Sequence, residues 1–347
     1  MTFDPNAAAA ADSGVFGLPS TEADARVILL PVPFDVTTSY GKGTAGGPAA
    51  ILEASRQVDL FDLDTGRPYE AGVFMLDEHP DVRRWNETGN ALSAKVIEAC
   101  GVVEGDASLE AALREVNAIG AQLNDHVHAE ARRLLDAGKI VGLVGGDHAT
   151  PFGAIRAHAE RFAELSVLHF DAHADLRPAY EGFTWSHASI MHNVLGHTPV
   201  ARLVQVGIRD FSEEEYDAVG RSNGRVVSFY DADLKRAQRN GQPFDDVAAQ
   251  IAGALTAQVY VSFDIDGLDP ALCPHTGTPV PGGLAFHEAC AILEAVVRSG
   301  RRIVGFDLNE VAPGPDGDEW DANVGARVLY KLIGWTLVSQ GLARPRR

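Results

Sequence analysis

Residues 166–177 read SVLHFDAHADLR. The first half is an apolar run, which is typical of a strand buried on both faces of a parallel sheet. The second half places Asp171, His173 and Asp175 at alternate positions, with only alanine between them. In an extended chain, residues two apart point to the same side. The stretch therefore predicts a buried strand whose carboxyl end presents three polar side chains to one centre and turns the alanines toward the core.

The same rhythm of apolar strand and helix extends along the chain on both sides of this stretch. We expect strands at residues 25–33, 139–146, 165–170, 201–208, 225–230, 258–265 and 302–311. We expect helices at residues 91–99, 109–137, 151–162, 187–195, 244–255, 285–299 and 322–340, and a loop-like region at residues 61–90. Apolar strands that alternate with helices indicate an α/β fold with a mainly parallel central sheet, covered by helices on both faces.

No linker or low-complexity tract divides the chain, so the sequence predicts one catalytic domain at residues 25–340. Residues 1–24, rich in alanine, are expected to form a flexible N-terminal extension, and residues 341–347 a basic tail. The extension has no basic segment before its short alanine run, which argues against a secretory signal peptide.

Composition excludes several classes of function. The 347 residues carry 29 Lys and Arg against 48 Asp and Glu, a formal net charge of −19. Such an acidic surface repels nucleic acid and anionic membranes. The three cysteines form no CxxC pair, which disfavours a disulfide framework and a thiolate zinc site. With no apolar run of membrane-spanning length, we expect a cytoplasmic protein with a small-molecule partner.

Polar clusters follow four of the expected strands. They are GGDHAT at residues 145–150, DAHAD at 171–175, DIDGLDP at 264–270 and DLNEVAP at 307–313. In open α/β sheets, ligands bind outside the carboxyl ends of the strands. Four clusters at one rim would therefore make a single site.

These clusters supply two imidazoles and four carboxylates as candidate metal ligands: His148, Asp171, His173, Asp175, Asp264 and Asp266. Four carboxylates gathered without cations would repel one another strongly. A pair of divalent cations removes that conflict, and a ligand set of oxygen and nitrogen without thiolate suits Mn²⁺ best, with Co²⁺, Ni²⁺, Fe²⁺ or Zn²⁺ as alternatives. Two such cations that share a water lower its pKa, so the implied chemistry is hydrolysis.

Three of the motifs, GGDHA, DAHADLR and SFDIDGLDP followed by TGTPVPGGL, resemble the signature motifs of the ureohydrolase superfamily. This superfamily contains arginase, agmatinase, guanidino-acid hydrolases and formiminoglutamase. Residues 31–51 are similar to its opening strand and loop, and the resemblance spans about residues 27–338. It implies a three-layer α/β/α fold, two Mn²⁺ per subunit, and a homotrimer or homohexamer.

The resemblance also implies a role for each candidate ligand. One metal would be held by His148, Asp171, Asp175 and Asp264, and the other by Asp171, His173, Asp264 and Asp266. Asp171 and Asp264 would then bridge the two. Asp175 would additionally orient the attacking hydroxide, and the products would be urea and an amine.

Two further residues gain roles from the same resemblance. Glu310 lies where the family has a glutamate that pairs with the substrate guanidinium, and such a contact can be bidentate. His187 lies where arginase and agmatinase have a catalytic histidine, although Ala188 stands in place of the usual glycine. By contrast, Asp147 is expected to cap a helix and Asp269 to stabilise a turn.

Arg177 bears on the identity of the substrate. It follows Asp175 by two residues, as in the DLR of formiminoglutamases, where it implies a partner for a substrate carboxylate. It could equally form a structural ion pair. Agmatinase-type hydrolysis is the first expectation, followed by arginase or a guanidino-acid hydrolase such as guanidinobutyrase, and then by formiminoglutamase. Two other classes remain open: a binding protein without activity, and a zinc deacetylase with one metal.

Overall fold

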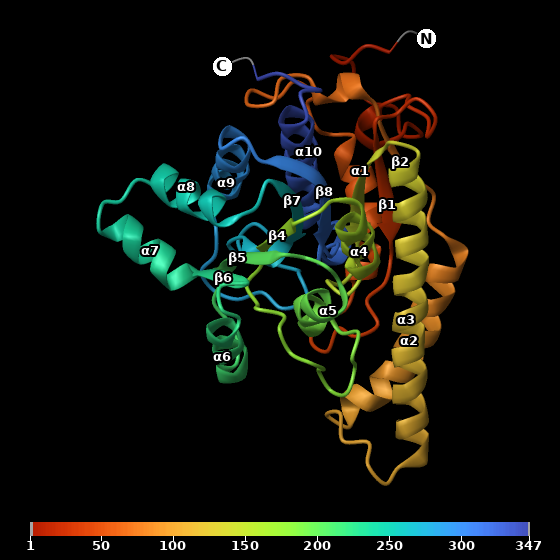
Figure 1. The fold of residues 1–347 in the computed structure, drawn as a ribbon. Helices are drawn as coiled ribbons and strands as arrows, with labels where there is room; N and C mark the ends of the chain where they lie inside the picture. Colours follow the sequence, from red (N-terminus) through yellow and green to blue (C-terminus); the bar gives the residue numbers. More distant parts are fainter. Residues whose placement is uncertain (1–2, 346–347) are drawn as a thin grey trace.

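The computed structural model describes residues 3–345, and its centre is an eight-stranded sheet in which every pairing is parallel (Figure 1). The strand order is β2-β1-β3-β8-β7-β4-β5-β6. The strands are β1 Val27–Val32, β2 Val73–Met75, β3 Ile140–Gly145, β4 Leu165–Phe170, β5 Arg202–Ile208, β6 Val226–Tyr230, β7 Gln258–Asp264 and β8 Arg302–Asn309. The expected parallel sheet is confirmed, and β2 is a short edge strand that the sequence did not indicate.

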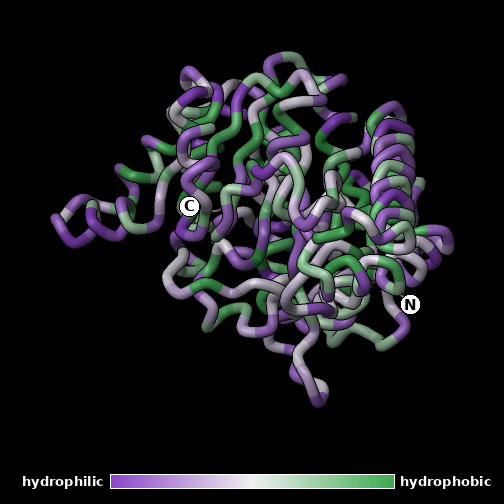
Figure 2. The backbone as a smooth tube through the Cα atoms, turned by 90° about the horizontal axis from the view of Figure 1, so that it is seen from below, coloured by the Kyte–Doolittle hydropathy of each residue, from purple (hydrophilic) through white to green (hydrophobic). Residues whose placement is uncertain are grey.

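Helices cover both faces of the sheet, which confirms the three-layer arrangement. The helices are α1 Gly47–Ser55, α2 Pro80–Glu98, α3 Ala107–Asp136, α4 Phe152–Arg161, α5 Ile190–His197, α6 Glu213–Arg221, α7 Asp231–Arg239, α8 Phe244–Ala254, α9 Phe286–Arg298 and α10 Trp320–Ser339. Apolar side chains of α1, α8, α9 and α10 form one core with the sheet, while those of α3, α4 and α5 form the core on the other face. Hydrophobic segments accordingly lie inside the molecule and hydrophilic ones on its outer turns (Figure 2).

The loop expected at residues 61–90 is wrong in its last third, because α2 begins at Pro80. Pro80 occupies the first turn, and the ring nitrogen of His79 accepts a hydrogen bond from Asp81 N at 3.2 Å. Only Val82, Gly89, Ser93 and Val96 of this helix are buried. Before residue 91, where the predicted helix begins, only Val82 and Gly89 of α2 are buried, which is too few for a periodic apolar pattern. The charged helices α6 and α7 escaped prediction for the same reason.

The segment expected to be a flexible extension partly lies against the domain. Val15 and Phe16 are 2% exposed, and the Phe16 ring lies 4.9 Å from that of Tyr330 in α10. Residues 1–2 and 346–347, parts of the expected extension and basic tail, lie outside the described residues. The domain boundaries and the flexibility of the extension stay predictions.

The sheet order explains how distant motifs meet. The four strands that carry polar clusters, β3, β8, β7 and β4, are consecutive neighbours in the sheet. Because all of them run parallel, their carboxyl ends lie on the same rim. The topology therefore delivers residues from four separate parts of the chain to one place.

Candidate metal centre

Each strand end contributes buried side chains to a single cluster. His148 follows β3, Asp171 follows β4, and Asp264 is the last residue of β7. All three are at most 3% exposed. Within the described residues, two groups of histidine and acidic side chains lie close enough together to hold a cation. One consists of His148, His169, Asp171 and Asp175, and the other of Asp171, His173 and Asp266.

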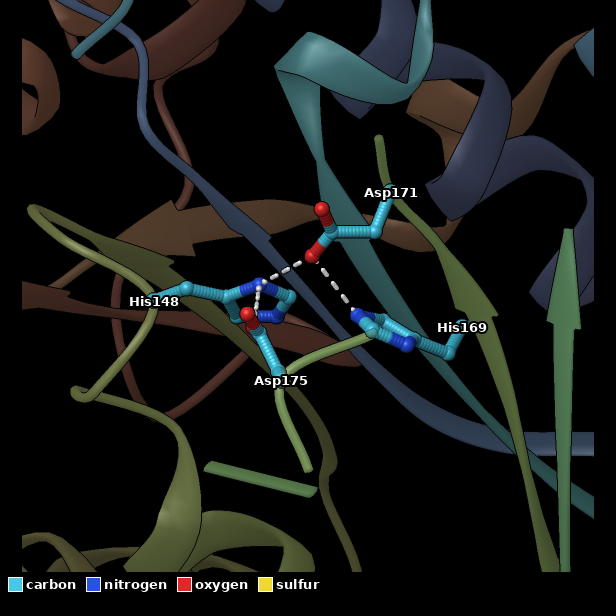
Figure 3. Close-up of side chains that lie close together, drawn as sticks. All are labelled: His148, His169, Asp171 and Asp175. Atoms are coloured by element: carbon cyan, nitrogen blue, oxygen red, sulfur yellow. Dashed lines mark hydrogen bonds and ion pairs between the residues drawn. The ribbon is translucent and has the colours of Figure 1, made fainter. Parts of the chain in front are cut away.

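Asp171 and Asp175 of the first group, together with Asp264, surround one ring nitrogen of His148. His148 Nδ1 lies 3.0 Å from Asp171 Oδ2, 3.2 Å from Asp264 Oδ2 and 3.5 Å from Asp175 Oδ2. Figure 3 shows the carboxylates of Asp171 and Asp175 turned toward this imidazole. These are the four residues that the family resemblance assigned to one metal.

The second group surrounds His173. Its Nδ1 lies 3.3 Å from Asp171 Oδ1 and 3.1 Å from Asp266 Oδ2. Asp171 thus directs one oxygen toward each group, as a bridging ligand would. Asp264 directs Oδ2 toward His148, while its Oδ1 accepts a hydrogen bond from Asp266 N at 2.8 Å.

The backbone that carries these ligands is not the extended chain that alternate spacing suggested. Strand β4 ends at Phe170, and Asp175 has a left-handed φ of 54°. Asp266 lies in a 3₁₀ turn, Ile265–Gly267, and its own backbone amide donates a hydrogen bond to Asp264 Oδ1. The carboxylates converge because turns redirect the chain and not because strand geometry continues. The alanines at 172 and 174 are buried, as expected.

His169 belongs to the first group by distance, since its Nε2 is 2.8 Å from Asp171 Oδ2 (Figure 3). Gln205 fixes its tautomer. Gln205 Nε2 donates to Ala174 O at 2.7 Å and lies 3.1 Å from His169 Nδ1, so Nδ1 is the acceptor. Nε2 then carries the proton and donates it to Asp171. His169 therefore orients a ligand and has no lone pair for a metal.

A similar relay fixes His148 from behind. Its Nε2 lies 2.9 Å from Ser262 Oγ, and Ser262 donates to Asp307 Oδ1 at 2.9 Å. The Ser262 oxygen therefore accepts the Nε2 proton of His148. Nδ1 is therefore the ring nitrogen that faces the carboxylates, and it can ligate a metal ion when it carries no proton.

The buried carboxylates of the cluster repel one another, so that positive charge between them would stabilise the site. Burial, together with the neighbouring carboxylates of Asp266 and Asp171, raises the pKa of Asp264 well above its usual range. Burial and Asp171 do the same to the pKa of Asp175. Burial opposes protonation of His148, but its contacts with Asp171 and Asp264 outweigh burial and raise its pKa well above the ordinary value.

A test of fit for cations comes from Asp266. Its Oδ1 accepts a hydrogen bond from Ala172 N at 3.0 Å. Its Oδ2 is buried and has no hydrogen-bond donor among the described residues, although it lies 3.1 Å from His173 Nδ1. A buried carboxylate oxygen needs positive charge beside it, which a metal ion or a protonated His173 would supply. The donor set therefore fits divalent metal ions.

A cavity of about 170 Å³ opens beside the cluster. Its lining includes His173, Asp175 and His187 from the predicted site, and Tyr180 and Phe211, which were not predicted. A larger cavity of about 480 Å³ lies along the N-terminal segment and has none of the predicted site residues in its lining. The smaller cavity is therefore the candidate substrate cleft.

His187 has one free ring nitrogen toward this cleft. Its backbone amide donates to Thr37 Oγ1 at 3.2 Å, and its Nδ1 lies 3.3 Å from the same oxygen. Thr37 in turn donates to Asp147 Oδ2 at 3.1 Å. Nε2 has no hydrogen-bond partner among residues 3–345. Burial, together with the positive charges of His173 and Lys42, lowers the pKa of His187 to about 3.

Glu310 is buried at the end of β8 with a φ of 63°. Its Oε1 accepts a hydrogen bond from His148 N at 2.8 Å, and its Oε2 has no partner within the described chain. A Cβ at Gly277 would lie 3.2 Å from Oε2, so glycine leaves space on that side. Burial and the charge of Asp147 raise the pKa of Glu310 well above its usual range.

Arg177 lines the cleft but is already engaged. Its Nε lies 3.6 Å from Glu215 Oε2, and its guanidinium carbon lies 5.4 Å from the centre of the Tyr180 ring. This is the structural ion pair that the sequence left open. The side chain is 39% exposed, so its terminal nitrogens can still reach solvent.

Asp269 stabilises a turn as expected, but Asp147 does not cap the helix that follows it, because the N-cap of α4 is Pro151 and no side chain caps this helix. Asp147 Oδ1 accepts a hydrogen bond from Ala149 N at 3.1 Å, and Asp269 Oδ1 accepts one from Ala271 N at 2.9 Å. Asp147 has a further contact, through Thr37, to His187. Burial and the nearby Asp35 raise its pKa to about 7.

Several residues around the site were missed from the sequence. Gln205 and Ser262 are single polar residues within apolar strands, and that isolation was a visible signal. Glu215 and Tyr180 gave no such signal, because each lies in a polar or turn-rich segment where its residue type is ordinary.

Comparisons with known proteins agree with this geometry. Residues 25–334 match the model of the arginase family. The chain is 35% identical to an N(1)-aminopropylagmatine ureohydrolase of Thermus thermophilus, covering 92% of this chain and 94% of that protein. It is 34% identical to the agmatinase of Photorhabdus laumondii, covering 90% and 87%.

Among solved structures, proclavaminate amidino hydrolase from Streptomyces clavuligerus aligns with a TM-score of 0.72. The two sequences are 24% identical, and the alignment covers 96% of this chain and 100% of that one. At this identity, the likeness establishes the fold alone. None of the helices within residues 3–345 combines the length and the apolar character needed to cross a bilayer.

Proposed function

The chain belongs to the arginase family, whose members hydrolyse guanidino C–N bonds at a two-metal site, and we propose that it is a manganese-dependent ureohydrolase of the agmatinase type. It would act on a linear guanidino amine and release urea and the parent amine. The observation that carries this proposal is Asp171, whose two oxygens face two separate groups of ligating side chains.

Six residues would hold the metal pair: His148, Asp171, His173, Asp175, Asp264 and Asp266. When bound, the cations supply a water of lowered pKa and offset the negative charge that develops on the substrate. The mixed carboxylate and imidazole donors favour Mn²⁺, with Co²⁺, Ni²⁺ or Fe²⁺ as substitutes.

The chain's own residues would bind and orient the substrate. The free Oε2 of Glu310 can accept a hydrogen bond from the guanidinium, and two charged planar groups pair strongly when buried. Asp175, which lines the cleft, can accept the proton of the attacking water and orient it. His187 Nε2 is unprotonated at neutral pH, because the pKa of this histidine is about 3, and it can accept a hydrogen bond from the substrate or from the attacking water.

The charge at the cleft favours a cationic tail. Arg177, the one basic side chain among the lining residues apart from the histidines, is within 3.6 Å of Glu215, so the pair has no net charge. The cleft also contains Asp210. A substrate carboxylate would have to compete for Arg177, whereas an ammonium group would not. The relatives named as agmatinase and N(1)-aminopropylagmatine ureohydrolase agree with this choice.

A guanidino-acid hydrolase is the second candidate, and one observation favours it. The Arg177 side chain is 39% exposed beside Glu215, so its guanidinium can still be reached by a substrate carboxylate. Arginase and formiminoglutamase activities would use the same group.

A substrate panel tests the proposal. Mn²⁺-loaded protein should release urea from agmatine or N(1)-aminopropylagmatine with a kcat/KM at least about 10-fold above that for 4-guanidinobutyrate and arginine. Agmatine and 4-guanidinobutyrate are matched in length and differ in the charge of the tail. A higher kcat/KM for 4-guanidinobutyrate than for agmatine would identify the protein as a guanidino-acid hydrolase instead. If the Mn²⁺-loaded protein releases urea from none of these compounds, the ureohydrolase proposal fails. The protein would then be either a formiminoglutamase or a binding protein without activity, and an assay for formamide release from formiminoglutamate distinguishes the two.

The trimer or hexamer implied by the family resemblance and the cytoplasmic location stay predictions. Light scattering of the purified protein tests the first of these.

A further inference from the structure

Glu215 is a buried carboxylate at the edge of the candidate cleft, where it lies beside Arg177, but its hydrogen bonds are made elsewhere. It is 4% exposed and belongs to α6, a helix that otherwise lies on the surface. Its Oε2 accepts hydrogen bonds from Ser212 N at 2.8 Å and Ser212 Oγ at 2.9 Å, which closes the capping box of this helix. A capping box is usually solvent-exposed and needs no buried charge. Helix capping therefore accounts for one oxygen only.

The other oxygen reaches the metal-ligand loop. Glu215 Oε1 accepts a hydrogen bond from Leu176 N at 3.0 Å, across 39 positions of sequence. Leu176 directly follows Asp175, the candidate ligand with a φ of 54°. A residue other than glycine holds a left-handed conformation only where its surroundings fix the chain on both sides.

The opposite side of this loop is held by the segment that carries His187. Asp175 O accepts hydrogen bonds from Met191 N and His192 N, both at 3.1 Å, and Arg177 N donates to Ala188 O at 3.2 Å. The loop is thus fixed between α5 on one side and Glu215 of α6 on the other. The same carboxylate, through its 3.6 Å contact with Arg177 Nε, also holds the next side chain of the loop.

We propose that Glu215 is a positioning residue for the metal centre: it clamps the amide of Leu176 and so keeps Asp175 in the conformation that faces His148. This rests on the proposed metal-binding role of Asp175. A buried acceptor on a separate helix presets the ligand before any cation arrives, so its loss reduces metal affinity as well as turnover.

Three variants separate this role from helix capping. Glu215→Met removes both acceptors and keeps the volume. Glu215→Gln keeps one oxygen that can accept from Leu176 N. Ser212→Ala removes the hydroxyl of the capping box and leaves Glu215 and Leu176 in contact. Mn²⁺ affinity is measured by titration calorimetry on metal-depleted protein, with thermal unfolding in parallel.

We expect Glu215→Met to weaken Mn²⁺ binding about 10-fold or more, Glu215→Gln to recover most of that loss, and Ser212→Ala to bind as the wild type does. Equal weakening in Glu215→Met and Ser212→Ala would reduce Glu215 to a helix cap. Wild-type affinity in folded Glu215→Met would also overturn the proposal. If the wild type itself binds no Mn²⁺, the proposed function fails instead.

If Glu215→Met does not fold, a measurement on the wild-type protein tests the same proposal. Hydrogen exchange of the Leu176 amide should be slow in metal-depleted protein, because the clamp exists before the metal binds. Fast exchange that becomes slow only on adding Mn²⁺ would show that the metal orders the loop and that Glu215 does not.

Discussion

At the scale of single residues, metal binding by a histidine of the cluster depends on which of its ring nitrogens is not occupied by a hydrogen bond. His148 gives Nε2 to Ser262 and keeps Nδ1 for the carboxylates, whereas His169 gives Nε2 to Asp171 and has Nδ1 occupied by Gln205. Two histidines within 3.0 Å of the same oxygen of Asp171 therefore have different roles. Residue type and spacing could nominate both, but only their hydrogen-bond partners distinguish a ligand from a residue that orients one.

Asp264 provides a direct test at this scale. Asp264→Asn keeps the shape of the side chain but removes the charge that faces His148 at 3.2 Å. We expect bound Mn²⁺, measured by elemental analysis, to fall well below the wild-type content and urea release to be abolished, because a neutral amide ligates divalent cations poorly.

The matched control is Asp269→Asn, five residues further along, whose carboxylate accepts a hydrogen bond from the Ala271 amide and from no other group within residues 3–345. It should keep both metal and activity. Full activity in metal-depleted Asp264→Asn would contradict the two-metal mechanism.

At the scale of elements, a buried histidine in a helix away from the metal centre affects the stability of the fold. His158 of α4 is fully buried, its Nδ1 lies 2.7 Å from Ala154 O, and its ring lies 4.8 Å from that of Tyr260. A Cβ at Gly305 of β8 would lie 2.2 Å from His158 Nε2, so glycine in the strand makes room for the ring. Burial lowers the pKa of His158 to about 4.

This histidine gives the fold a dependence on pH. Because its pKa is about 4 in the folded protein and about 6.5 in the unfolded chain, the unfolded state binds the proton first. Stability is therefore complete above about pH 6.5 and is lost as the pH falls toward 4, by about 2 kcal/mol at pH 5. Urea unfolding of His158→Gln between pH 7 and 5 should show a shallower loss than the wild type.

His287→Gln, at an exposed position, is the control and should keep the wild-type slope. Since His158→Gln also alters packing, the change of slope with pH decides the outcome and not the absolute stability. Identical slopes in all three proteins would show that the pKa of His158 does not differ between the folded and unfolded states.

At the scale of the whole molecule, the N-terminal segment joins the fold in a way that its composition concealed. Phe16 packs beside Tyr330, and its backbone amide donates to Ser55 Oγ at 2.9 Å. The segment therefore connects α1 and α10 on the face of the sheet formed by α1, α8, α9 and α10. None of residues 3–24 lines the candidate substrate cleft, so the contribution of this segment should concern stability.

Phe16→Ala should lower the free energy of unfolding by about 3 kcal/mol, the usual cost of removing a buried phenyl ring, and leave kcat/KM unchanged. Denaturant unfolding and the urea assay measure the two quantities. Phe3→Ala, at a partly exposed aromatic of the same segment, is the control and should change neither by much. An unchanged stability in Phe16→Ala would restore the prediction of a flexible extension.

The sequence by itself determined the fold class and nominated the cluster. Apolar strands between helices require a sheet covered on both faces, and polar residues at the ends of parallel strands must share a rim. The six candidate ligands followed from residue type and spacing together with the family resemblance, and the structure brings all six into one cluster.

Only the tertiary structure decided how the ligands are held. Strand alternation was the wrong reason for the convergence of Asp171, His173 and Asp175, since Asp175 turns through a left-handed φ. The side chains that fix this turn and the histidine tautomers, Gln205, Ser262 and Glu215, come from other strands and from α6. Local patterns report which face of an element is buried, but hydrogen bonds between residues distant in the chain exist only once the elements have packed.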